Sequence, residues 1–430
     1  MREMKDSGMP WIGKIPKDWK TDKFKYHLKR SEPRNPGNQV VLSLYRDYGI
    51  IPKDSRDDNH NVTSEDTSNY KYVQIGDFVV NKMKAWQGSV AVSNYEGIVS
   101  PAYYVYKFSD HQIYKKYLHY LLRACYKDEF MRLSGGLRVG QWDLSADGLG
   151  NTYILIPPYD EQVKIADYLD SKKEKIDSIR EGVEAEIEAL KQYKKSVVTE
   201  AVTKGLDKDV EMKDSGIPWI GNIPKKWQIV PLKRLVLMPI KDGTHQTPTY
   251  TESSNGIPFL SSGNVRTGKI NWENIKYITP ELHEKLSKEV KPQINDILLA
   301  KNGTTGVAAI VDKNYIFDVY VTLAVIRDNP QYLIPRFLLY AINSNISKYQ
   351  FNQSLKGIGT PNLHLDEINK TRILVPTLAE QCQIADFLHS KCARIDSIIQ
   401  KKQELLANLD TYKKSLIYEC VTGKKEVPAV

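Results

Sequence analysis

Two internal repeats constrain the fold of this chain more than any other feature. The turn-rich segment MKDSGMPWIGKIPKDWK (4–20) returns as MKDSGIPWIGNIPKKWQ (212–228). A longer segment that begins PPYDEQVKIADYLDSKKEKIDSI at residue 157 returns as PTLAEQCQIADFLHSKCARIDSI at residue 376. Because a fixed internal repeat reveals how a chain is organised, the sequence predicts a tandem duplication of one structural frame.

The segments between the repeats have diverged, and they read as two globular blocks with short strands and many loops. In each block a turn, Gly76-Asp77 or Asn295-Asp296, leads into a β-rich run. The predicted fold class is α/β (α+β), with two globular domains, a pair of long helices and an internal pseudo-twofold repeat. The predicted boundaries are a repeat segment (1–19), a first domain (20–156), a central long helix (157–205), a linker with the second repeat segment (206–228), a second domain (229–375), a C-terminal long helix (376–425) and a tail (426–430).

Both long helices carry an amphipathic pattern with heptad-like spacing. Pro157 and Pro158 precede the first helix, and Gly205 follows it, as is typical of helix boundaries. One helix cannot bury such a seam alone, so the two copies are predicted to pair antiparallel as a coiled coil. The alternative is that each helix packs on its own block as an ordinary core helix. The residues assigned to the seam are Ile165, Leu169, Ile176, Ile179, Val183, Ile187, Leu190, Tyr193 and Val197, and in the second copy Ile384, Leu388, Ile395, Ile398, Leu405, Leu409, Tyr412 and Leu416.

Composition restricts the class of protein. The hydrophobic content of 41% is that of a globular protein, and no apolar run approaches the length of a membrane helix. The four cysteines show neither CxxC spacing nor a disulfide framework, so a reducing cytoplasm is expected. The formal net charge is +9. Since positive and negative residues nearly balance in the helices, the excess lies on the blocks and favours a polyanionic partner.

No motif in the sequence indicates catalysis. The segment IPPYDE resembles a methyltransferase motif, but Ile156 replaces the polar residue that such a motif needs. The Gly-rich loops GTTG (303–306) and GIG (357–359) are too short for a dinucleotide or P-loop fingerprint. His residues are scattered singly, so no metal site is predicted. The chain is therefore expected to be no enzyme.

Together these parts resemble the specificity subunit of type I restriction-modification enzymes. The resemblance rests on the duplicated PWIGxIPxxW segments, the two divergent blocks, and the EQxxIADxLxxKxxxIDSI helices that end in YKKSxxxExVT, and it covers essentially the whole chain.

The resemblance implies that each block is a target recognition domain for one half of a bipartite, asymmetric DNA sequence. The paired helices would set the length of the unspecified spacer and dock two modification subunits. It also implies no cofactor on this chain: S-adenosylmethionine is expected on the modification subunits, and ATP and Mg on restriction subunits that join through them. Two other classes remain as alternatives, namely a coiled-coil adaptor and a fused DNA methyltransferase or nuclease.

Candidate DNA-binding residues are polar or basic side chains on loops, which are the groups that reach base edges and phosphates. In the first block they are Arg46, Lys82, Lys84, Trp86, Gln87, Arg138 and Gln141. In the second block they are Thr244, His245, Gln246, Arg266, Lys301, Asn302, Thr304 and Lys356. Trp86 fits a core position equally well.

Candidate partner-binding residues are those that recur in both copies of the frame. The tryptophans would anchor each block to the helix ends or to a partner docked there, and the tyrosines fit packing between the helices equally well. The candidates are Trp11, Trp19, Tyr193, Lys194, Lys195, Trp219, Trp227, Tyr412, Lys413 and Lys414.

Overall fold

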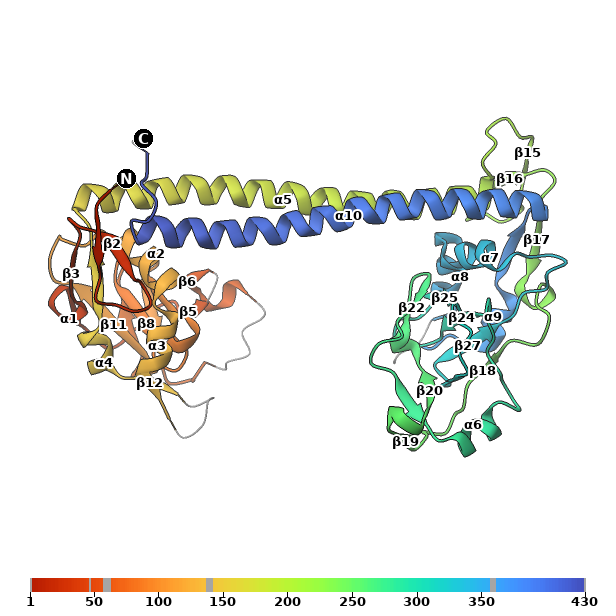
Figure 1. Cartoon of the computed structure of the whole chain (residues 1–430), viewed down its shortest axis with the longest axis horizontal. Helices are drawn as coiled ribbons and strands as arrows, with labels where there is room; N and C mark the ends of the chain where they lie inside the picture. The colour runs from red at the N-terminus through yellow and green to blue at the C-terminus, as the bar shows by residue number, and fades with distance from the viewer. Residues whose placement is uncertain (1, 46–47, 57–62, 137–141, 356–360, 429–430) are drawn as a thin grey trace. The chain divides into compact units, whose positions relative to one another are not determined.

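The structure is a computed structural model and divides into two compact units (Figure 1). The first unit comprises Met1–Val183 with Gln403–Val430, and the second comprises Glu184–Lys402. Each unit therefore contains one globular block and a part of each long helix. The residues that the structure describes are 2–45, 48–56, 63–136, 142–355 and 361–428.

The first unit is built on a four-stranded antiparallel sheet in the order β4-β11-β8-β9, surrounded by two-stranded sheets and short helices. The central sheet contains β4 (Leu28–Arg30), β8 (Phe78–Asn81), β9 (Val90–Val92) and β11 (Tyr103–Phe108). The paired small strands are β1 (Met4–Asp6) with β2 (Lys14–Pro16), β3 (Lys20–Lys23) with β14 (Tyr153–Ile156), β5 (Leu42–Tyr45) with β6 (Gly49–Pro52), β7 (Lys71–Val73) with β10 (Gly97–Val99), and β12 (Ser134–Gly135) with β13 (Asp143–Leu144). The short helices are α1 (Phe24–His27), α2 (Lys115–Cys125), α3 (Lys127–Leu133) and α4 (Ala146–Asn151).

The second unit repeats the central sheet and adds a second one. Its sheet β18-β27-β24-β25 is antiparallel, and its sheet β19-β23-β20-β26 contains one parallel pair, β20 with β26. The strands are β15 (Met212–Asp214), β16 (Asn222–Pro224), β17 (Gln228–Pro231), β18 (Lys241–Asp242), β19 (Tyr250–Thr251), β20 (Ile257–Leu260), β21 (Val265–Arg266), β22 (Lys269–Ile270), β23 (Lys276–Ile278), β24 (Ile297–Ala300), β25 (Ala308–Ile310), β26 (Asp318–Val319), β27 (Leu323–Ile326) and β28 (Arg372–Val375). The short helices are α6 (Pro280–Leu286), α7 (Pro335–Asn343), α8 (Asn345–Ser354) and α9 (Leu365–Lys370).

The turns predicted from the sequence are confirmed, and they are the same turn in both units. The Asp77 carboxylate accepts a hydrogen bond from the Gln74 N–H at 2.9 Å, and the Asp296 carboxylate accepts one from the Gln293 N–H at 2.8 Å. The turn residue before each aspartate has a positive φ, 88° at Gly76 and 72° at Asn295. The strands that follow, β8 and β24, are inner strands of their four-stranded sheets.

The two long helices are α5 (Tyr159–Lys204) and α10 (Leu378–Val421), within a few residues of the predicted boundaries. In the first unit Asp177 binds Lys413 at 2.6 Å, and Arg180 binds Asp410 at 2.5 Å. Because the residue numbers rise along α5 while they fall along α10, the helices run antiparallel.

The second unit contains the same antiparallel arrangement. Glu186 pairs with Lys402, and Lys194 binds Asp396 at 2.5 Å. The pair Lys194–Asp396 occupies the positions of Lys413 and Asp177 in the duplicated helix, so one ion pair is repeated in both units.

The predicted seam is partly wrong. Ile179 is 52% exposed and Leu405 is 43% exposed, as is typical of a free helix face. The inward-facing positions follow the alternate three- and four-residue spacing of a heptad, but several of them are basic side chains held in ion pairs with the opposite helix. Apolarity alone therefore identified buried positions such as Ile176, Ile187 and Ile395, but it also selected exposed ones and missed the basic ones. Along α10 the inward-facing residues are Cys392, Ile395, Ile399, Lys402, Leu406, Leu409, Lys413 and Leu416.

The helix ends also belong to the cores of the blocks, so the two interpretations of the helices are both partly correct. Ile165 and Leu169 at the start of α5 lie in the core of the first unit, together with Leu416 near the end of α10. The last turns of α5, with Ala201, and the first turns of α10, with Ile384, lie in the core of the second unit. Each core therefore requires both helices.

The repeated tryptophan segments connect each block to a helix start. Trp19 is fully buried, and its Nε1–H donates to Glu161 Oε2 at 3.0 Å. Trp227 is 1% exposed and donates to Glu380 Oε1 at 3.2 Å. Of the two roles predicted for these two tryptophans, the structure favours the anchoring of a block to the helices.

The glycines at the helix ends make room for these tryptophans. Gly205, with φ +78°, directly follows α5, and a Cβ there would lie 3.3 Å from the Trp227 ring. Gly423, with φ +70°, follows α10, and its Cβ would lie 2.4 Å from Pro16 and 3.0 Å from Trp19. The end of one helix and the start of the other therefore meet at the same repeated segment in each unit.

Within the described part of the chain, no helix has both the length and the apolar character that crossing a bilayer requires.

Candidate nucleic-acid interface

Five loops of the second unit converge at one end of the sheet that contains β24. Thr304 Oγ1 donates to the Ser262 carbonyl at 3.3 Å, and the Ser262 N–H donates to Thr322 Oγ1 at 3.0 Å. The Val321 N–H donates to the Thr244 carbonyl at 3.1 Å. Asn302 forms a bridge with Asn362 on the fifth loop.

Most candidate DNA-binding residues of the second block lie on this loop cluster. His245, Gln246 and Thr304 are exposed on it. Arg266 is exposed beside it, and its guanidinium donates to the Gly263 carbonyl at 2.8 Å. Asn302 is half-buried, and its Oδ1 is buried without a hydrogen-bond partner among the described residues. The cluster thus presents amide, hydroxyl, imidazole and guanidinium groups, which are the groups that read base edges.

The equivalent loop of the first unit follows β8. Lys84 is exposed, Gln87 is half-buried, and Trp86 lies in the one-turn 3₁₀-helix η2 (Ala85–Gln87). The Trp86 ring packs edge-on against Trp142 at 5.8 Å, and its Nε1–H donates to the Met83 carbonyl at 3.1 Å. Trp86 is therefore held in place by its neighbours while it remains half-buried.

The two equivalent lysines, Lys82 and Lys301, do not project freely from their loops. Lys82 Nζ lies 2.8 Å from Asp143 Oδ2, and this hydrogen bond raises the pKa of Lys82. Lys301 is 6% exposed and is paired with Asp242. Both ammonium groups are therefore neutralised within the protein.

Four candidate DNA-binding residues lie outside the described residues, so the structure does not place them. They are Arg46, Arg138, Gln141 and Lys356.

The sequence missed several groups beside the loop that follows β8. Trp142 and Asp143 directly follow the Gly-rich segment, and a tryptophan beside an acidic residue after such a loop is a signal that could have identified them. Arg30 lies over the Tyr104 ring at 4.6 Å and is paired with Glu32 at 2.8 Å. No sequence pattern marks Arg30, because only the sheet pairs β4 with β11, the strand that carries Tyr104.

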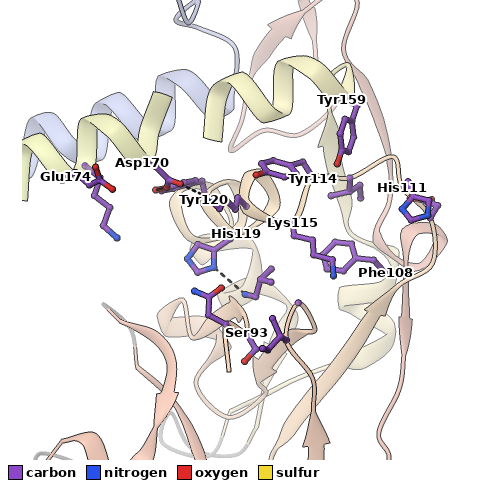
Figure 2. Close-up of a pocket in the computed structure, with 18 of the residues that line it drawn as sticks. Ser93, Phe108, His111, Tyr114, Lys115, His119, Tyr120, Tyr159, Asp170 and Glu174 are labelled. Atoms are coloured by element: carbon purple, nitrogen blue, oxygen red, sulfur yellow. Dashed lines mark hydrogen bonds and ion pairs between the residues drawn. The ribbon is translucent and has the colours of Figure 1, made fainter. Parts of the chain in front are cut away.

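A cavity of about 890 Å³ lies on another side of the first unit, between α2 and α5 (Figure 2). Figure 2 shows Tyr120 of α2 and Tyr114, the residue just before α2, on one side of the cavity, and Tyr159 at the start of α5. Ile75 and Gly76, in the turn just before β8, also line it. Because the loop with Lys84 and Trp86 follows the other end of β8, the cavity and this loop lie at opposite ends of the strand.

The charged groups that line the cavity carry both signs and are partly paired. Asp170 binds Lys116 at 2.9 Å and accepts from Tyr120 Oη at 2.5 Å. His119 Nδ1 accepts from the Val92 N–H at 3.3 Å, and burial, followed by the charges of Arg123 and Lys173, lowers the pKa of His119 to about 3. A neutral histidine among aromatic rings and mixed charges suits a protein segment better than it suits a polyanion.

The candidate partner-binding residues on the helices fall into two groups. Lys194 and Lys413 are held in the repeated ion pair between the helices, although the sequence favoured a partner for them. Tyr193 and Tyr412 are 50% and 48% exposed, so neither is buried between the helices.

The remaining candidates are the next lysines and the outer tryptophans. Lys195 and Lys414 are exposed. Trp219 is 40% exposed and packs on Tyr349 at 5.5 Å. Trp11 is half-buried against Tyr126 at 5.9 Å.

Among the described residues no group of three or more His, Cys, Asp or Glu is arranged to hold a metal ion. The four cysteines are free thiols, of which Cys382 is exposed.

A comparison with protein families matches residues 25–189 and 224–407 to the type I restriction modification DNA specificity domain. The type I restriction enzyme MjaVIII specificity subunit of Methanocaldococcus jannaschii is 26% identical over 428 residues, which cover 96% of this chain and 94% of that protein.

Two solved structures share the fold. One, described as the structural basis of complex assembly and conformational transition of the type I R-M system, has a TM-score of 0.72 at 15% identity and covers 96% of this chain and 99% of its own. The HsdS subunit from Thermoanaerobacter tengcongensis has a TM-score of 0.58 at 15% identity and covers 98% of this chain and 100% of its own.

Proposed function

The chain belongs to the family of type I restriction-modification DNA specificity proteins, and from this premise we propose that it is the non-catalytic specificity subunit of such a complex. Each globular block reads one half of a bipartite, asymmetric DNA target. The methyl transfer takes place on a partner that this subunit directs to the site.

The equivalence of the two recognition loops is the observation that carries this proposal. Lys82 and Lys301 directly follow the equivalent strands β8 and β24. The two loops thus leave the same place in the framework, but the side chains that come after the lysine differ. One loop presents Trp86 and Gln87, and the other presents Asn302 and Thr304. Two loops that occupy the same place in the framework but present different polar groups are expected to recognise two different half-sites.

The partners are double-stranded DNA and a modification subunit. We propose two modification subunits, because the exposed pair Tyr193 and Lys195 has an identical counterpart in Tyr412 and Lys414. Restriction subunits would join through them. S-adenosylmethionine is expected on the modification subunits, and ATP and Mg on the restriction subunits. The free thiols agree with a cytoplasmic location.

The cavity of the first unit is a second candidate surface for the modification subunit. Its aromatic rings and mixed charges lie next to α5, away from the recognition loop. A partner that docks along α5 would therefore reach the cavity without blocking the DNA-binding loops.

Mapping methylated adenines in a genome that expresses this chain with its modification partner tests the proposed function. We expect one asymmetric motif with two specified halves around an unspecified spacer. Exchanging residues 229–375 for the block of a relative should change one half only. A change in both halves would contradict independent reading, and methylation without any motif would favour the adaptor alternative.

The docking surface predicts a separate result. Replacing Tyr193 and Tyr412 by alanine should weaken assembly with the modification subunit at least tenfold, because exposed tyrosines are frequent hot spots of interfaces. Analytical ultracentrifugation of the mixed subunits measures this. The matched control is Tyr315→Ala, since Tyr315 is equally exposed (52%) but lies on a block. Equal loss in the control would argue against docking on the helices.

A further inference from the structure

The main chain of the lysine that follows the inner strand β8 or β24 is held in the same way in both units. The Lys82 N–H donates to the Ala102 carbonyl at 3.1 Å, and the Lys301 N–H donates to the Thr322 carbonyl at 2.9 Å. The Lys82 carbonyl accepts from the Leu144 N–H at 3.0 Å, and the Lys301 carbonyl accepts from the Leu363 N–H at 2.7 Å. The main chain at this position is therefore part of the common framework.

The carboxylate that neutralises each lysine comes from a different part of each block. Asp143 lies after the strand in sequence, on β13, whereas Asp242 lies before it, on β18. The side chains of Lys82 and Asp143 are 28% and 39% exposed, but those of Lys301 and Asp242 are only 8% and 12% exposed. The equivalent lysines, Lys82 and Lys301, thus connect their loops to different neighbouring segments in the two units.

In the second unit this pair lies beneath the loop cluster. Asp242 accepts from Lys301 through Oδ2, and its Oδ1 lies 3.4 Å from His245 Nε2. The His245 side chain is 75% exposed. One carboxylate therefore links a buried ammonium group to an exposed imidazole.

We propose that Lys301, together with Asp242, is a positioning residue for base recognition rather than a DNA contact. Through the pair, the loop that carries Asn302 and Thr304 is fixed relative to the loop that carries His245 and Gln246. This inference rests on the proposed function. It adds the ion pair that fixes the relative positions of two DNA-binding loops in the second unit.

The burial of Lys301 argues against a phosphate contact. A lysine that contacts phosphate keeps its ammonium group in solvent until DNA arrives. Lys301 would first have to leave Asp242, and the carboxylate would then remain buried without its partner, which is costly. Lys84 is exposed two residues beyond Lys82, so it can reach a phosphate without breaking a pair.

Three variants separate positioning from contact and from simple stability: Lys301→Met, Asp242→Asn, and the double variant. The complex with the modification subunit is titrated with duplexes that carry the mapped target or one substituted base pair in either half-site, over a range of salt concentrations. Thermal unfolding is measured on the same complexes. Lys84→Met is the matched control in the first unit.

For positioning we expect Lys301→Met to lower the discrimination against substituted bases at least fivefold in one half-site, with the other half-site unchanged. The slope of log affinity against log salt concentration should stay as in the natural protein. Lys84→Met should instead reduce that slope by about one and weaken all duplexes alike. The double variant should recover thermal stability, because no unpaired charge remains, but should not recover discrimination.

Two results would overturn the inference alone. A reduced salt slope with intact discrimination in Lys301→Met would make Lys301 a phosphate contact. If the double variant recovers both thermal stability and base discrimination, Lys301 and Asp242 contribute only to stability and do not position the loops. If the natural complex shows no preference between duplexes, the proposed function itself fails, and this inference fails with it.

Discussion

At the scale of single residues, the glutamine of the repeated Glu-Gln dipeptide makes the same hydrogen bonds at the start of both long helices. Gln162 is fully buried, donates to the carbonyls of Gln112 and Pro157 at 2.8 Å, and accepts from the Tyr114 N–H at 2.8 Å. Gln381 makes the same three bonds in the second unit, to Tyr332, Pro376 and Ile334. A buried amide that satisfies three main-chain groups cannot be replaced without leaving unpaired polar atoms.

His119 makes stability depend on pH. Its pKa of about 3 lies below the ordinary 6.5, so folding favours the neutral ring. The stability it contributes is complete above pH 6.5 and decreases as the pH falls from 6.5 towards 3. His119→Gln keeps an acceptor for the Val92 N–H but cannot titrate. Between pH 7 and pH 5 we expect the free energy of unfolding to fall further in the natural chain than in the variant, by up to about 2 kcal/mol. Chemical unfolding at both pH values measures this difference.

The second unit offers an internal comparison for His119. The equivalent residue in the second unit is Leu339, on α7, so that unit offers no such titration. Equal pH dependence of the natural chain and His119→Gln would show that the buried ring does not control acid sensitivity.

At the scale of elements, the ion pairs between α5 and α10 set the register of the helices. Both copies of the repeated pair join a lysine in the seam to an aspartate on the opposite helix, Lys194 with Asp396 and Lys413 with Asp177. A slip of either helix would separate these charges, whereas an apolar seam alone tolerates several registers.

Charge reversal tests the register. Lys194→Glu places like charges beside Asp396 and should reduce the free energy of unfolding by about 1 kcal/mol, since exposed pairs contribute little individually. Adding Asp396→Lys should restore most of it, and the same cycle on Lys413 and Asp177 should give a similar coupling. Urea unfolding at low and high salt measures both cycles. A double variant no more stable than Lys194→Glu would contradict a direct pairing.

At the scale of the whole molecule, the proposed spacer function predicts an effect of helix length. Inserting seven residues after Val183 in α5 and seven after Lys402 in α10 adds about 10 Å while it keeps the heptad pattern. Adenine methylation mapping should show both half-sites unchanged and a longer spacer, by roughly three base pairs at about 3.4 Å each. Methylation should be slower, because the added base pairs rotate one half-site relative to the other. An insertion in α5 alone should instead disrupt pairing.

The sequence by itself determined the duplication, the two long antiparallel helices, the turns at Asp77 and Asp296 and the family, because each depends on local pattern or on the comparison of two copies. Only the tertiary structure decided which residues face one another. It placed Arg180 and Lys194 in the seam and left Ile179 outside, since burial depends on the opposite helix as well as on apolarity.

The candidate DNA-binding surface divides in the same way. Loop position and residue type were sufficient to select His245 and Thr304, which lie together on one cluster. They could not reveal that Lys301 is neutralised by Asp242, because the two residues are far apart in the chain. Whether a basic side chain can meet DNA depends on the carboxylate beside it, and only the packing of the strands brings that carboxylate into place.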